Sequence, residues 1–379
     1  MNYSRQELTQ RFVARLLSTS TPLTSLFLAA HRRTGKSTFI REDLRQALEA
    51  NGALVIYADL WNNKAVDPSA VIASAIFEKI EEQKPKTKWF SEIESIDLSI
   101  AGVGVSAQKG KKTLDLSFSE ALSELSDKTK KKIVLMVDEF QHALTTAGGE
   151  NALFSLKAAR DELNSSKHHG MIILGTGSNQ DKLASMRNSK EQAFYLTHLT
   201  TLAYLDKNFT NWLVKQSGLD LDPDVVWSLF EKSGHKPEIV NGAIADLQLS
   251  APTEGSVTRV FQKMVEYVLE KDAEEQTKKI NALPVTQWAV LGFMASDDKK
   301  TGLQTKESFE ACQNLARQRG ETVRFDASVV QGALLGLQKK KFLWSEARGT
   351  YHIEDEQIVS IMKNLIKNLP IKSSTQPNP

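Results

Sequence analysis

The sequence has almost no cysteine and no long apolar run, and each absence excludes a class of protein. Of its 379 residues only Cys312 is a cysteine, so neither a disulfide within the chain nor a zinc site built on several cysteines is available. No apolar run reaches the roughly 18 residues of a membrane span, and residues 1–20 lack the apolar stretch of a signal peptide. We therefore expect a cytoplasmic protein with no membrane partner and an ordinary, partly buried Cys312.

An excess of charge of one sign is lacking as well. The chain has 48 Lys and Arg against 46 Asp and Glu, a net charge of +2, so no overall field draws it to nucleic acid or to an anionic membrane. This balance leaves open DNA binding by a single face. Hydrophobic residues make up 41%, enough for a sizeable core, and the length favours two or three domains. The polar, proline-rich end leads us to expect a disordered tail over 366–379.

Continuous apolar runs alternate with helical patterns over the first 200 residues. Strands are predicted at 26–30, 53–61, 132–140 and 171–177, and helices at 4–18, 38–52, 67–82 and 151–164. This alternation predicts an α/β fold in which a parallel sheet carries helices on both faces. Residues 84–117 interrupt it, and their alternating polarity on either side of Gly110 predicts a β-hairpin or small antiparallel flap. Such a flap would pack on the core or form a partner or oligomer surface.

From about residue 200 the strand–helix alternation stops, and the pattern predicts mostly helices. We assign 1–200 to a core domain, 201–280 to a helical lid and 281–365 to a winged helix. The winged-helix prediction rests on three helices, at 285–295, 309–319 and 326–342, followed by two short apolar stretches joined by "SEARG".

The segment "AAHRRTGKSTF" resembles the phosphate-binding pattern G-x-x-x-x-G-K-[ST]. Ala30 stands at the first glycine position of this pattern. That position should tolerate alanine better than any other replacement, because alanine has the smallest side chain after glycine. Backbone N–H groups of residues 32–36 would wrap a β-phosphate, Lys36 would reach the β- and γ-oxygens, and Ser37 would bind Mg²⁺. The candidate nucleotide-binding residues are Ala30, His31, Arg32, Arg33, Thr34, Gly35, Lys36, Ser37 and Thr38.

Two later segments have the residues that a phosphate-binding loop needs for Mg²⁺ binding and catalysis. The apolar strand "IVLMVDEF" ends in Asp138, a candidate Mg²⁺ ligand, and Glu139, a candidate catalytic base for the water that attacks the γ-phosphate. The strand "MIILGTG" is followed by Ser178 and Asn179, which would orient that water. The carboxyl ends of parallel strands meet at one edge of a sheet, where ligands bind in open α/β folds. Together the three segments predict binding of ATP and Mg²⁺, and hydrolysis of ATP.

For several residues near these segments, the sequence allows two alternative roles. Asp59 ends the second predicted strand, so it either lies near the site or caps the strand. His31 and His142 either bind a metal together, or His31 faces solvent and His142 contacts the adjacent helix. Arg32 and Arg33 either touch phosphates or a neighbouring subunit, or are solvated loop charges.

With these segments in place, the chain resembles the AAA+ and STAND-related P-loop ATPases of the archaeal-type ATPase group. The resemblance is carried by "HRRTGKSTF", "VLMVDEFQHAL", "LGTGSNQDKL", "SGHKP" and "RGTYHIEDE", and it covers most of residues 20–360. It implies that Lys36, Ser37, Asp138 and Glu139 carry the chemistry, and that Ser178 or Asn179 is the sensor.

The same resemblance implies roles outside the central motifs. Pro237 would touch adenine, and Lys236 is a candidate for a second sensor. Relatives often supply an arginine finger across a subunit boundary from the segment that contains Arg187, so we expect a homo-oligomer in ATP. The alternative is that Arg187 is a surface arginine.

Two outputs of such an ATPase remain open. In the first, an ATP-driven switch acts on double-stranded DNA through the winged helix, where Lys339–Lys341 and Arg348 would meet phosphates. Residues 284–360 hold ten Lys and Arg and ten Asp and Glu, so this domain is less basic than most DNA-binding modules. In the second, a STAND-like signalling switch uses the winged helix to dock a protein partner or to inhibit itself. The long lid and the winged helix argue against a small-molecule kinase.

Overall fold

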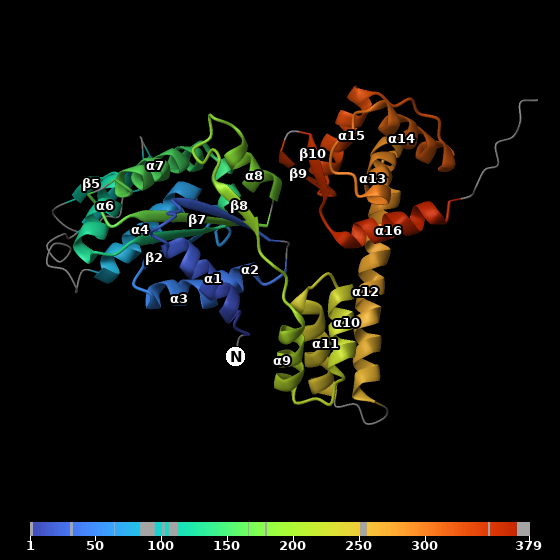
Figure 1. Cartoon of the computed structure of the whole chain (residues 1–379), viewed down its shortest axis with the longest axis horizontal. Coiled ribbons are helices and arrows are strands. Elements are labelled where there is room, and N and C mark those ends of the chain that lie inside the picture. Colours follow the sequence, from blue (N-terminus) through green and yellow to red (C-terminus); the bar gives the residue numbers. More distant parts are fainter. Residues whose placement is uncertain are drawn as a thin grey trace, which may run out of the picture. The chain divides into compact units, whose positions relative to one another are not determined.

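The chain divides into two compact units, Met1–Ala203 and Tyr204–Pro379 (Figure 1). The computed structural model describes residues 3–30, 33–63, 65–83, 95–100, 103–105, 113–165, 167–178, 180–250, 256–347 and 349–369. The boundary between the units falls close to residue 200, where the sequence pattern places the end of the core domain. Across these described ranges, no helix is long and apolar enough to cross a membrane.

The first unit is built on a five-stranded parallel sheet, and the predicted α/β class is confirmed. Its strands are β1 (Ser25–Ala29), β2 (Leu54–Asp59), β6 (Ile133–Asp138), β7 (Met171–Gly177) and β8 (His198–Thr201), in the order β2-β6-β7-β1-β8. The edge strand β8 is not among the predicted strands. All pairings are parallel, so the carboxyl ends of β1, β7 and β6 lie next to one another.

Helices cover both faces of this sheet (Figure 1). One face packs against α1 (Gln6–Leu17) and the helical run formed by α2 (Lys36–Thr38), the π-helical segment η1 (Phe39–Leu44) and α3 (Arg45–Ala50). The other face packs against α4 (Pro68–Gln83), α6 (Phe118–Thr129) and α7 (Ala147–Leu163). The 3₁₀ helix η3 (Phe140–Thr145) follows β6, and α8 (Gln180–Asn188) follows β7.

Alternation of side chains along each strand explains why the apolar runs are continuous. In β1, Leu26 and Leu28 belong to the cluster under α1 and α3, whereas Phe27 and Ala29 belong to the cluster under α4, α6 and α7. Successive side chains of a strand point to opposite faces, and here both faces are buried. Such strands need apolar residues at every position.

The insertion between α4 and α6 forms a small sheet of its own. Strand β3 (Ser95–Ile100) pairs antiparallel with β4 (Val103–Val105) and parallel with β5 (Thr113–Leu116). The predicted hairpin is therefore found only in part, because the two stretches on either side of Gly110 do not pair as antiparallel partners. Gly110 itself lies outside the described residues.

The second unit is mainly helical, as predicted. It contains α9 (Lys207–Ser217), α10 (Pro223–Lys232), α11 (Pro237–Ser250) and the long α12 (Val257–Asn281), then α13 (Val285–Asp297), α14 (Lys306–Gln318), α15 (Ala327–Lys339), β9 (Leu343–Ala347), β10 (Thr350–Ile353) and α16 (Glu356–Lys367). Strands β9 and β10 pair antiparallel. Helix α16 was not predicted as a separate element, and residues 370–379 of the expected tail lie outside the described residues.

One apolar cluster joins α13, α14, α15, α16 and the β9–β10 hairpin. Cys312 is buried within it, and burial raises the pKa of its thiol to about 12. The thiol is therefore neutral and inert at physiological pH, which agrees with the ordinary structural role expected for it.

Candidate nucleotide-binding and catalytic site

The chain makes a tight turn where β1 ends and the helical run begins. Ala30 N–H donates to Gly177 O at 3.2 Å, which holds the end of β1 against β7. Arg33 and Gly35 both have positive φ, 63° and 84°, and only glycine adopts such a conformation without strain. The helix begins at Lys36, so its first N–H groups form the kind of helix terminus that binds phosphate.

The alanine at the first glycine position is fully buried. Ala30 is 0% exposed and belongs to the apolar cluster under α1 and α3. Its methyl group therefore packs into the core beneath the turn. This packing gives a physical reason why alanine is accommodated at a position where the pattern has glycine.

Lys36 lies among acceptors from two neighbouring strands. Its side chain is 6% exposed, and Nζ contacts Asp138 Oδ1 directly, Glu139 Oε1 at 3.1 Å and Thr176 Oγ1 at 3.3 Å. Asp138 and Glu139 stand at the end of β6, and Thr176 stands near the end of β7. Because β7 lies between β1 and β6, the lysine that follows β1 reaches across β7 to the carboxylates.

Asp138 accepts several hydrogen bonds at once. Ser37 Oγ donates to its Oδ2 at 2.8 Å, and the Thr176 hydroxyl donates to its Oδ1. Asp138 as a whole residue is 2% exposed. Burial alone would raise the pKa of Asp138, but the charge of Lys36 and the hydrogen bonds from Lys36, Thr176 and Ser37 outweigh it and lower the pKa. Asp138 is therefore ionised at neutral pH.

Glu139 is held in an unusual backbone conformation. Its φ of 53° lies in the left-handed region, which non-glycine residues seldom adopt. Its Oε2 accepts from Ser178 Oγ at 2.9 Å and from Gln141 Nε2 at 2.5 Å. Burial would raise the pKa of Glu139, but the charge of Lys36 and the hydrogen bonds lower it. Sequence reasoning missed two members of this cluster, Thr176 and Gln141.

The donor set suits Mg²⁺ together with a nucleotide. Ser37 and Asp138 present two adjacent oxygens, the ligand type that Mg²⁺ prefers, and Mg²⁺ usually takes its remaining ligands from water and phosphates. Lys36 faces two ionised carboxylates, so the buried cluster carries excess negative charge that a cation would neutralise. Within the described ranges, no group of three or more His, Cys, Asp or Glu side chains could hold a metal ion by itself.

Other predicted residues of the loop are placed as follows. Thr34 is buried, whereas Arg33 and Thr38 are exposed. His31, Arg32 and Asn179 lie outside the described residues. The proposed metal pair of His31 and His142 therefore stays untested.

Three further predicted residues stand on other elements. Arg187 is half-buried in the last turn of α8, and its Nε has no hydrogen-bond partner within the described part of the chain. Pro237 begins α11 in the second unit. Lys236 Nζ lies 3.8 Å from Asp272 Oδ2 and 3.4 Å from Asp355 Oδ2, both also in the second unit.

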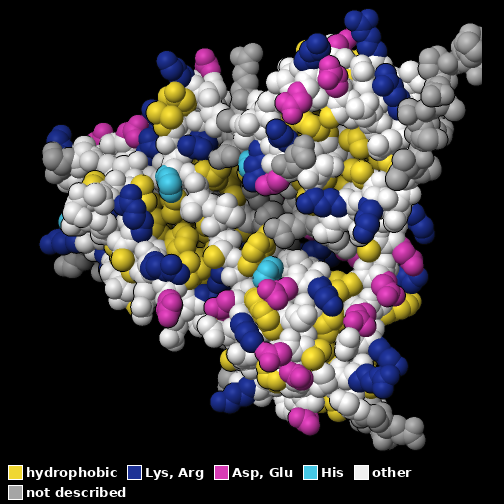
Figure 2. All heavy atoms as spheres, turned by 45° about the vertical axis from the view of Figure 1, so that its right-hand side comes forward, with side chains coloured by type: hydrophobic (Ala, Val, Ile, Leu, Met, Phe, Trp, Pro, Cys, Tyr) yellow, Lys and Arg dark blue, Asp and Glu magenta, His cyan; other side chains and the backbone are white. Residues whose placement is uncertain are grey.

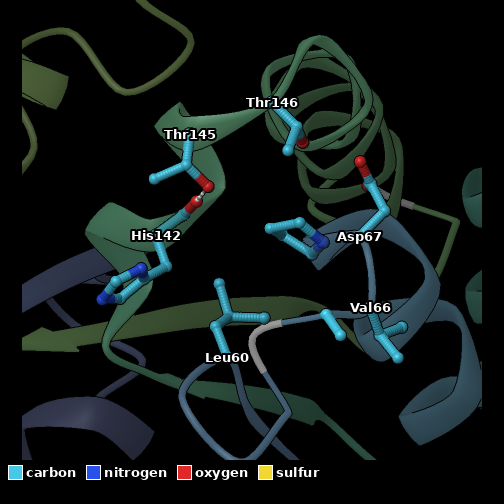
Figure 3. A pocket seen from close by; sticks show the side chains of 8 residues that line it. Leu60, Val66, Asp67, His142, Thr145 and Thr146 are labelled. Carbon is cyan, nitrogen blue, oxygen red and sulfur yellow. Dashed lines mark hydrogen bonds between the residues drawn. The ribbon is translucent and has the colours of Figure 1, made fainter.

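Asp59 and His142 have local structural roles. Asp59 Oδ1 accepts from Trp61 N–H at 2.9 Å, which caps the strand, and Asp59 pairs in register with Asp138, so both alternatives hold. The His142 ring meets Trp61 edge-on, with centroids 4.4 Å apart. A pocket of about 400 Å³ lies beside His142 (Figure 3). Its lining includes Leu60, Val66, Asp67, His142, Thr145 and Thr146. In that view Thr145 Oγ1 donates to His142 O at 2.7 Å.

Comparison with known proteins finds a family model that matches most of the first unit and solved structures with the same fold. A family model described as "AAA domain" matches residues 23–183, whereas no curated protein matches the sequence. The solved structure of the Aeropyrum pernix ORC2 protein in its ADP form superposes with a TM-score of 0.58 at 13% identity, covering 95% of this chain and 92% of that one. The structure of the same protein as ADPNP-ADP complexes gives 0.53 at 14% identity, with the same coverage. At such identities the likeness shows the fold, which is that of the P-loop ATPases, and residues 23–183 match the AAA domain model.

Proposed function

We propose that this protein is a Mg²⁺-dependent ATPase that works as a molecular switch. The observation that carries the proposal is the position of Lys36, buried between Asp138 and Glu139 at the carboxyl edge of the sheet. A lysine at a helix terminus, next to one carboxylate bonded to Ser37 and another bonded to Ser178, supplies the phosphate-binding cation, the Mg²⁺ ligand and the base used in phosphoryl transfer. In an AAA domain this arrangement favours ATP as the nucleotide.

Each residue then has a distinct task. Residues 32–36 would surround the β-phosphate with backbone N–H groups, and Lys36 would leave the carboxylates to bind the β- and γ-oxygens. Ser37 and Asp138 would hold Mg²⁺, which supplies charge neutralisation when bound. Glu139 would accept the proton of the attacking water, and Ser178 would keep Glu139 oriented. Asn179 is a second candidate for contact with that water.

Turnover by three proteins tests this assignment. We expect the wild type to hydrolyse ATP, Lys36→Ala to lose binding and turnover, and Glu139→Gln to bind ATP without hydrolysing it. A general base contributes roughly 10²- to 10⁴-fold to a rate, so the Glu139→Gln loss should be at least about a hundredfold. A wild type that binds no ATP would contradict the proposal.

We further propose that the second unit contacts double-stranded DNA. Three helices followed by an antiparallel hairpin, α13 to β10, support a winged helix. Lys339 and Lys341 are exposed at the end of α15, while Lys340 Nζ donates to Gln287 Oε1 at 2.9 Å. On the face of the molecule drawn in Figure 2, Lys and Arg side chains are interspersed with Asp and Glu side chains. Residues 284–360 hold as many Asp and Glu as Lys and Arg, so the contact would rest on a few lysines. Arg348 lies outside the described residues.

Charge reversal tests the DNA contact. Lys339→Glu with Lys341→Glu should abolish retention of duplex DNA and its salt dependence, because the phosphate contacts supply that dependence. Unchanged retention, or stimulation of turnover by a protein and not by DNA, would favour the alternative, a STAND-like switch whose winged helix docks a protein or inhibits the ATPase.

Arg187 supports a proposal on assembly. Its Nε is buried without a hydrogen-bond partner in the described chain, while Arg187 as a whole is only half-buried, and a guanidinium in that state suits a contact supplied by a second subunit. We propose that ATP promotes a homo-oligomer in which Arg187 reaches the neighbouring site, as an arginine finger does. Pro237 would contact adenine from the lid. A strictly monomeric ATP-bound protein with normal turnover would contradict the assembly.

A further inference from the structure

The side chain of Gln141 has no task in the mechanism above, yet it lies inside the site. Gln141 is 2% exposed, and its Nε2 donates to Glu139 Oε2 at 2.5 Å. Its Oε1 is buried without a hydrogen-bond partner among the described residues. A buried polar atom without a partner costs stability. Packing alone would therefore favour an apolar residue here.

Strand β7 leaves room for this glutamine. A Cβ at Gly177 would lie 2.2 Å from Gln141 Oε1, and a Cβ at Gly175 would lie 2.3 Å from Phe140 Cδ1. Neither glycine is among the residues with positive φ, so close packing, and not backbone conformation, explains their lack of a side chain. The two glycines let η3 press onto β7, while Thr176 between them bonds to Asp138.

The contact decides how the Glu139 carboxylate is turned. Gln141 and Ser178 both donate to Oε2, which leaves Oε1 toward Lys36 at 3.1 Å. The reverse orientation of the Gln141 amide would set its oxygen against an ionised carboxylate, so the hydrogen-bond network determines the assignment. Two donors on one oxygen hold the carboxylate in a single orientation, and its other oxygen becomes available to water once Lys36 turns to the phosphates.

We propose that Gln141 is a positioning residue that orients Glu139 toward the attacking water. This inference rests on the proposed ATPase function. Gly177 belongs to the same device, because any side chain there would displace the Gln141 amide. The side chain of Gln141 donates to Glu139, the proposed base, and not to a proposed phosphate ligand, so its loss should affect catalysis and leave nucleotide binding intact.

The first test replaces glutamine by a residue of similar length without a donor. We expect Gln141→Met to lower kcat about tenfold, a fraction of what a general base contributes, with KM and ATP affinity within about twofold of wild type. Gln10→Met, at an exposed position on α1, is the matched control and should leave both unchanged. Retained ATP affinity also shows that the variant is folded.

The second test reaches the same contact from the other side. Gly177→Ala should lower kcat to a similar extent by displacing the Gln141 amide. Because both changes remove one interaction, the double variant should be no slower than either single variant. In the Glu139→Gln background, Gln141→Met should have no further effect.

The outcomes separate this inference from the function on which it rests. Wild-type kcat in Gln141→Met, a parallel loss of ATP affinity, or fully additive effects with Gly177→Ala would each overturn the role of Gln141. Normal turnover by Glu139→Gln would instead overturn the assignment of the base itself.

Discussion

Each unit of the molecule contains one lysine between two carboxylates, and the two clusters differ chiefly in burial. In the first unit the side chains of Lys36, Asp138 and Glu139 are 6%, 3% and 13% exposed. In the second unit Lys236 is 20% exposed, and its partners Asp272 and Asp355 are 33% and 34% exposed.

The difference shows what burial adds to the same set of charges. Water screens the charges of the Lys236 cluster, so its ion pairs contribute little to the free energy of unfolding. The Lys36 cluster is shielded from water, and a change in one member leaves the others with uncompensated charge. A phosphate or cation that enters such a buried cluster changes its energy strongly. The Lys236 cluster forms only weak ion pairs, which link the segment before α11 to α12 and to the N-terminus of α16.

The largest expected effect comes from removing the buried lysine. Lys36→Met leaves Asp138 and Glu139 buried without a counter-charge, and should lower the free energy of unfolding by about 3–5 kcal/mol at pH 7. Urea denaturation measures the loss. Adding Asp138→Asn and Glu139→Gln should restore most of it. A loss below about 1 kcal/mol would mean that the cluster is open to water.

The equivalent change in the second unit should have a much smaller effect. Lys236→Met keeps the length of the side chain but removes the contacts with Asp272 and Asp355. The loss in free energy of unfolding should stay below about 1 kcal/mol, because all three groups are partly exposed. A loss as large as that of Lys36→Met would show that burial does not distinguish the two clusters.

The smallest effect is expected at the opposite edge of the sheet, at His168. Hydrogen bonding to Asp127 raises the pKa of His168 against the opposing effect of burial, and the charges of Asp127 and Glu162 add to the rise. The stabilisation is therefore complete below the unfolded pKa of about 6.5 and is lost as pH rises through the folded pKa. His168→Gln should cost less than about 1 kcal/mol at pH 5.5 and nothing at pH 9. His169→Gln at the exposed neighbour is the control, and an equal loss at both pH values would contradict the linkage.

Much of the fold follows from the sequence because the central strands are buried on both faces. The runs that form β1, β2, β6 and β7 are largely apolar, whereas a solvated loop would be largely polar. Strand β8 escaped prediction because it lies at the edge of the sheet, where His198 and Thr201 are exposed. Helix α16 does have a helical signal, since Asp355 caps it and Ile358, Ile361 and Met362 face the core.

The site was predictable only as far as it is contiguous in sequence. Lys36, Ser37, Asp138 and Glu139 follow from short motifs, and they lie together. Thr176 and Gln141 depend on which strands are neighbours and on how η3 packs against β7, which local spacing does not determine. The roles of Arg187 and Pro237 stay predictions, because each requires a contact beyond its own unit.

The central claim is that the Lys36 cluster is an ATP site, and direct binding tests it most simply. Isothermal titration of ATP with Mg²⁺ into the wild type and into Lys36→Met, at a temperature where both are folded, compares the two. We predict one saturable site in the wild type and none in the variant. Equal affinity in both proteins, or no binding by the wild type, would contradict the account.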